Sequence, residues 1–161
     1  MNMLSATEFT AGALADAKPL SLMLPRTKYE STVLVGSLQD KPAAVVLDGG
    51  SPFIFFPSSE NFSWRGLIIP DVMIEVDQES LFDPQSTTPR LGDIVRTSTQ
   101  LAVCGKADGH FGRQGRVLLH DGLLPAGSEQ SAGFSRWCVV IGAGADKRTL
   151  VEVDSKRKLE A

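Results

Sequence analysis

The chain has 161 residues, a formal net charge of −3 and a hydrophobic content of 42%. This length suits one domain with its own core, so we expect a single domain over residues 1–154 and a flexible tail over residues 155–161. The small negative charge argues against nucleic acid or an anionic membrane as a partner. No run approaches the ~20 apolar residues of a membrane span, and the N-terminus lacks the features of a signal peptide. We therefore expect a soluble, cytoplasmic protein.

The N-terminal segment carries the sequence signature of a helix start. Ser5 and Glu8 form the S-x-x-E pattern of a capping box, in which each side chain binds the backbone amide of the other residue. Apolar residues follow at helical spacing as far as Ala17, and Pro19 stops the pattern. We therefore predict one short α-helix over residues 6–17.

From about residue 29 onward, short apolar runs alternate with clusters of Gly, Pro, Asp and Ser, which is typical of β-strands joined by turns. The predicted strands are residues 29–37, 43–48, 52–56, 66–70, 72–77, 93–97, 100–104, 116–120, 136–142 and 149–154. The continuously apolar runs 44–47 and 138–141 predict central strands. The fold class is mainly β, a single-domain β-sandwich or small β-barrel with one N-terminal helix.

The two cysteines, Cys104 and Cys138, lie inside apolar runs and are expected to be small buried side chains. A disulfide between them remains open. Together with His110 and His120 they have the side-chain types of a zinc site, but their spacing matches no compact zinc module. We therefore predict neither a metal nor a cofactor.

One acidic residue, Asp48, ends an apolar strand in the sequence VVLDGGS, and the apolar run FIFFPS follows it. Over residues 29–59 this arrangement resembles the first active-site loop of the pepsin-like aspartic proteases. The resemblance implies peptide hydrolysis by two aspartates that share a proton and activate a water. The chain has one such loop, with Gly49 in place of a hydroxyl residue, so catalysis would need a retropepsin-like homodimer with two copies of Asp48. The alternative is a simple hairpin turn, which Asp-Gly and Gly-Gly steps favour.

Residues 105–116, GKADGHFGRQGR, combine glycines with basic side chains and a single acid, Asp108. Such a segment can bind a phosphate or stack a base; the alternative is a solvated hairpin loop. The ligand-binding residues we predict are Lys106, His110, Phe111, Arg113 and Arg116.

Aromatic side chains gather between residues 53 and 64, and alternation along a strand places Phe53 and Phe55 on the face opposite Ile54 and Phe56. Burial is one outcome, and a homodimer or partner interface is the other. The residues predicted for such an interface are Phe53, Phe55, Phe62 and Trp64.

An acidic run, with no basic residue between Arg65 and Arg90, is read as a solvated face or as a site for calcium or a basic partner. Its members are Asp71, Glu75, Asp77, Glu79 and Asp83.

These patterns favour a small, non-enzymatic binding or interaction module with an unidentified ligand or protein partner. Two alternatives remain, namely the homodimeric aspartic peptidase and nucleotide or nucleic-acid binding through residues 105–116.

Overall fold

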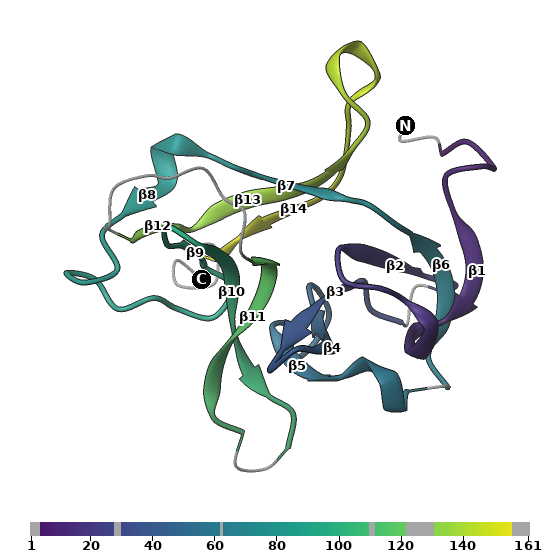
Figure 1. Ribbon diagram of the computed structural model, residues 1–161, viewed down its shortest axis with the longest axis horizontal. Helices are drawn as coiled ribbons and strands as arrows, with labels where there is room; N and C mark the ends of the chain where they lie inside the picture. The colour runs from purple at the N-terminus through teal and green to yellow at the C-terminus, as the bar shows by residue number, and fades with distance from the viewer. Residues whose placement is uncertain (1–3, 28–29, 62, 110–111, 122–130, 156–161) are drawn as a thin grey trace.

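The computed structural model describes residues 4–27, 30–61, 63–109, 112–121 and 131–155, with only the backbone of residues 120 and 121 (Figure 1). This part of the chain is mainly β, as predicted, and forms two sheets. None of its helices has the length and hydrophobicity of a membrane span.

The larger sheet has eleven strands and the smaller has three, in the order β14-β13-β7. The larger sheet contains β1 (Thr10–Ala13), β2 (Ser21–Pro25), β3 (Val33–Leu38), β4 (Lys41–Val46), β5 (Ile54–Pro57), β6 (Arg65–Ile69), β8 (Leu81–Phe82), β9 (Ile94–Arg96), β10 (Gln100–Ala107), β11 (Gln114–Asp121) and β12 (Ala132–Phe134). The smaller sheet contains β7 (Met73–Val76), β13 (Arg136–Ile141) and β14 (Arg148–Asp154), and the 3-10 turns are η1 (Leu14–Asp16), η2 (Ser58–Glu60), η3 (Gln78–Ser80) and η4 (Gly144–Asp146).

Five strands of the larger sheet close into a barrel. β3 pairs with β4, β4 with β5, β5 with β10 and β10 with β11, and β11 returns to β3. All of these pairings are antiparallel except that of β5 with β10. Closure leaves these strands without a free edge. Of the two architectures that the sequence leaves open, the structure therefore has the barrel.

The barrel interior is filled by apolar side chains, and the ring of Phe55 is its largest occupant near β10 and β11. A Cβ atom added at Gly105 would lie 2.9 Å from this ring, and one at Gly115 would lie 3.1 Å from it. The two glycines therefore leave the space that the ring needs.

A second apolar cluster covers the other face of β3 and β4 with side chains from η1, β2 and β6. Ile54 and Phe56 pack against this cluster, whereas Phe53 and Phe55 belong to the first one. The predicted opposition of the two pairs on β5 is confirmed.

The predicted N-terminal helix is wrong. The local signal is present, because the Glu8 carboxylate accepts a hydrogen bond from the Ser5 amide at 2.8 Å. A helix does not follow, because Thr10–Ala13 pairs with β6 as strand β1 and only Leu14–Asp16 turns as η1. Pairing with β6 satisfies the backbone that a helix would have satisfied internally.

Each predicted strand overlaps an observed one, whereas β1, β2, β8 and β12 were not predicted. Ser155, which was predicted to belong to the tail, is instead buried in the fold. Ser155 is 4% exposed, its amide donates to the carbonyl of Ser135 at 2.9 Å, and its hydroxyl donates to Asp93. The rest of that prediction, residues 156–161, lies outside the described residues.

Candidate functional site

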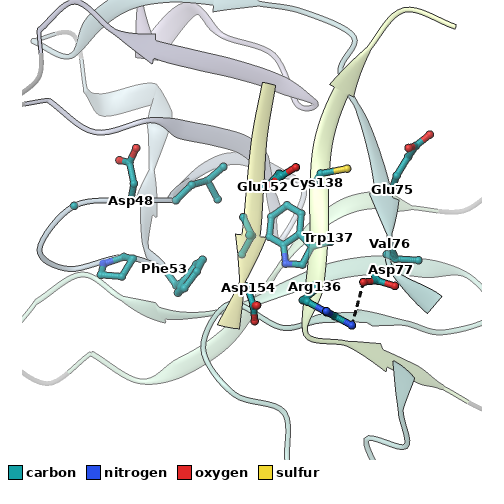
Figure 2. A pocket seen from close by; sticks show the side chains of 14 residues that line it. Asp48, Phe53, Glu75, Val76, Asp77, Arg136, Trp137, Cys138, Glu152 and Asp154 are labelled. Atoms are coloured by element: carbon teal, nitrogen blue, oxygen red, sulfur yellow. Dashed lines mark ion pairs between the residues drawn. The ribbon is translucent and has the colours of Figure 1, made fainter. Parts of the chain in front are cut away.

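A cavity of about 630 Å³ lies between the β4–β5 connection and the three-stranded sheet (Figure 2). One wall is formed by Leu47, Asp48, Gly49, Pro52 and Phe53, and the other by residues 75–77 of β7 with its flank, 136–138 of β13 and 152–154 of β14. In the view of Figure 2, Asp48 and Phe53 lie to one side of β13 and β14, and Glu75 and Asp77 lie to the other. A volume of this size suits a small ligand or a few side chains of a partner.

The apolar part of the cavity is built around two nearly buried aromatic residues. Phe53 is 3% exposed and Trp137 is 2% exposed. Both meet Gly92: the Trp137 indole nitrogen donates to its carbonyl at 2.7 Å, and a Cβ at this position would lie 2.5 Å from the Phe53 ring. The cavity floor is therefore held against the loop before β9.

Phe53 has a left-handed backbone with a φ of 67°, which is rare for a bulky residue. Two backbone hydrogen bonds hold it there, from its amide to Val46 at 2.6 Å and from the Lys106 amide to its carbonyl at 2.9 Å. Strain of this kind persists only where the surroundings fix it, and it often occurs where ligands bind.

The polar lining of the cavity is mostly acidic. Five carboxylates stand against one guanidinium, a surplus of four negative charges. Arg136 lies 3.1 Å from Asp77, and Lys147, outside the lining, lies 3.0 Å from Glu75. The five are Asp48, Glu75, Asp77, Glu152 and Asp154.

Cys138 lies on β13 between Glu75 of β7 and Glu152 of β14, its partners in register on either side. Burial, and then the charges of these two carboxylates, raise the pKa of its thiol. Burial also raises the pKa of Cys104. Both thiols are free, so the disulfide is excluded, and a raised pKa makes a poor nucleophile near neutral pH.

Asp48, the catalytic residue of the peptidase alternative, is exposed in the β4–β5 connection. One of its oxygens accepts a hydrogen bond from the Thr32 amide at 2.9 Å, which ties the connection to the residue before β3. The peptidase alternative needs two copies of this loop and remains a prediction. Loss of acid-dependent peptide cleavage in Asp48→Asn would be its direct test.

The comparisons with known proteins identify a family. Residues 11–161 match the family model described as "Uncharacterised protein y4lG". The chain belongs to the Y4lG family. The "Uncharacterized protein y4lG" of Sinorhizobium fredii (strain NBRC 101917 / NGR234) is 50% identical over 148 residues, which cover 92% of this chain and 91% of that protein. No solved structure matches.

In this member of the Y4lG family, the predicted ligand-binding segment is the β10–β11 hairpin. Lys106, Arg113 and Arg116 are exposed, and none of them lines the cavity. The remaining two residues of that prediction, His110 and Phe111, lie outside the described residues.

Two of the four residues predicted for an aromatic interface are buried in the core. Phe53 and Phe55 are 3% and 8% exposed, because both rings point into the first core, so a partner cannot cover them. Trp64 is half-buried, packs on Phe56 with ring centroids 5.2 Å apart and lines a smaller hollow of about 460 Å³. Phe62 lies outside the described residues.

The acidic run is divided by the fold. Glu75 and Asp77 line the cavity, whereas Asp71, Glu79 and Asp83 do not. Among the described residues, no three His, Cys, Asp or Glu side chains are placed to hold a metal ion.

Sequence reasoning missed several residues of the cavity, among them Arg136, Trp137, Glu152 and Asp154. The alternation of acids with apolar residues along residues 149–154 was a usable signal, since it places Glu152 and Asp154 on one face of a strand. Glu152 comes near Glu75 because β13 pairs with both β14 and β7, and β7 lies about 60 residues before β13, which no local pattern indicates.

Proposed function

We propose that the chain is a non-enzymatic binding module, and that its cavity holds a cationic group attached to an apolar body. The observation that carries this proposal is the combination of partly exposed apolar side chains, Pro52 and Val76, with a lining that has a surplus of four negative charges. Ligand sites are commonly apolar hollows in which a few polar groups fix the orientation of the ligand.

The distribution of charge supports a cation. Arg136 and Lys147 each neutralise one carboxylate of the lining. Asp48 and Glu152 form no ion pair with any described residue. An ammonium or guanidinium group between these two walls would gain charge-assisted hydrogen bonds. An anion would meet repulsion from the same groups.

Matched ligands can test the sign of the charge. Phenethylamine and 3-phenylpropanoate present a similar ring and linker with opposite charges. In a Trp64→Phe background, the fluorescence of Trp137 reports the cavity, because these are the two tryptophans of the chain. We expect a saturable change with the amine and none with the acid. Equal responses to both, or no response to either, would contradict the proposal.

A second variant locates the binding. Glu152→Gln keeps the shape of the side chain and removes its charge, so we expect about two- to fivefold weaker amine binding, as for a partly exposed ion pair. The control is Glu60→Gln, because Glu60 is exposed on η2 and lies outside the lining. Equal weakening in both variants would place the amine elsewhere on the surface.

A further inference from the structure

The acidic cavity has a complementary surface on the same chain. The β10–β11 hairpin carries three exposed basic side chains, Lys106, Arg113 and Arg116, with Asp108 as the acid between the strands. None of the three forms an ion pair with a described carboxylate. Exposed, unmatched charge of one sign is a common feature of surfaces that bind a partner.

The strand register places two of these cations together. Arg116 is the partner of Cys104, and Lys106 is the partner of Gln114. Residues two apart on a strand share a face, so Lys106 and Arg116 are diagonal neighbours on one face of the hairpin. This face offers paired cations on a two-stranded ribbon, which is the charge that the cavity lacks.

The hairpin is fixed where it leaves the barrel. The Lys106 amide donates to Phe53 at 2.9 Å, the Asp108 amide donates to Phe55 at 2.9 Å, and β10 pairs with β5 at this point. Figure 1 shows the hairpin projecting from the barrel. These bonds hold the base of the hairpin, and the basic side chains of the hairpin do not line the cavity of the same chain. The hairpin therefore does not neutralise the carboxylates of its own cavity.

We propose that the cation bound by the cavity is supplied by the β10–β11 hairpin of a second copy of this chain. The proposal rests on the proposed function, because it names the partner of the same cavity. Lys106 and Arg116 of one molecule then face Glu152 and its neighbouring carboxylates of the other. Such a contact joins two different surfaces, so the copies associate either reciprocally in a closed dimer or head to tail.

The test is a charge exchange between two variants of the full chain. The hairpin variant is Lys106→Glu with Arg116→Glu, the cavity variant is Glu152→Lys, and the control is Arg90→Glu with Arg96→Glu, two exposed arginines outside both surfaces. Self-association is measured by light scattering over a concentration series at about 0.01 M and about 1 M salt, where charge interactions reach about 30 Å and 3 Å. Thermal melts verify that each variant is folded.

We expect the wild type and the control to associate at low salt and to dissociate at high salt. Each of the two test variants alone should associate about tenfold more weakly. An equal mixture of these variants should associate again, because one retains the cavity and the other retains the hairpin. A wild type that stays monomeric at low salt, or association that ignores both variants, would overturn the inference.

Three further outcomes distinguish this inference from the proposed function and from binding of a polyanion. If phenethylamine binds the cavity while the wild type stays monomeric, the inference fails and the proposed function stands. If the mixture associates while phenethylamine does not bind, the second copy is the cavity's ligand and the small amine is not. A monomer that binds a DNA oligonucleotide, and loses that binding in the hairpin variant, would assign the hairpin to a polyanion and overturn the inference.

Discussion

The barrel interior and the cavity are both bordered by β-strands, but different kinds of side chain line them. Phe55 points into the barrel, where Gly105 and Gly115 leave room for its ring. Phe53, two residues earlier, adopts a left-handed backbone and borders the cavity. Both residues belong to the same core cluster, but only Phe53 also lines the cavity.

The two regions also differ in how polar groups are used. The barrel cluster contains apolar side chains, whereas the cavity gathers five carboxylates from β7, from β14 and from two connecting segments. Acidic groups brought close together in one hollow repel one another and oppose folding. Binding of a ligand therefore explains this grouping of carboxylates better than packing does.

The largest effect is expected for Phe55→Ala, which would empty the barrel interior. Removing a buried phenylalanine ring costs about 3–5 kcal/mol of the free energy of unfolding, because the glycine-lined space around it cannot collapse. Urea unfolding measures this change. Leu81→Ala is the control, since Leu81 is 59% exposed and its loss should cost below about 0.5 kcal/mol. Similar costs for both would show that the barrel is not the stabilising region.

A smaller effect is expected for Ser155→Ala, which tests the attachment of the cavity wall to the larger sheet. The Ser155 hydroxyl donates to the buried carboxylate of Asp93, next to the glycine that accepts the Trp137 hydrogen bond. Loss of one hydrogen-bond donor to a charged acceptor lowers the free energy of unfolding by about 1.5–3 kcal/mol. Thermal unfolding would report it, with exposed Ser59→Ala as the matched change. A loss no greater than that of the control would mean that the wall is held by packing alone.

The smallest effect is expected for Glu8→Gln and depends on pH. A hydrogen bond from Arg148, and then one from the Ser5 amide, hold the pKa of Glu8 below its ordinary value of 4.5. This carboxylate therefore stabilises the fold at pH above about 4.5, and the contribution disappears as the pH falls through its lower folded-state pKa. Melting temperatures between about pH 3 and 7 should fall less steeply with acid in the variant. Parallel curves for the two proteins would show that the pair at the chain's N-terminal segment contributes no linkage.

Local signals predicted the hairpins well. Gln39 and Asp40 both have positive φ angles, as a two-residue turn between β3 and β4 requires, and the sequence marks a turn at this position. The capping box at Ser5 failed for an equally local reason. It forms its hydrogen bond, but pairing of the next residues with β6 prevents a helix from extending.

The cavity could not be predicted in the same way. Its walls come from the β4–β5 connection and from the β14-β13-β7 sheet, in which the paired strands β7 and β13 are about 60 residues apart in the chain. Glu75, in the acidic run, was singled out from sequence as one member of a possible cation or basic-partner site. Its neighbour across Cys138, Glu152, was not, because strand register between distant segments sets which side chains meet.

The parallel pairing of β5 with β10 has a consequence for how the chain folds. The barrel closes only when residues 54 and 55 meet residues 106 and 107, and when Leu118 reaches Ser37. These contacts bridge about 50 and 80 positions, so most of the loop-closure entropy is lost before the barrel gains its interior contacts. We expect slow, cooperative folding, in which the nascent chain stays open at this seam until β11 has left the ribosome.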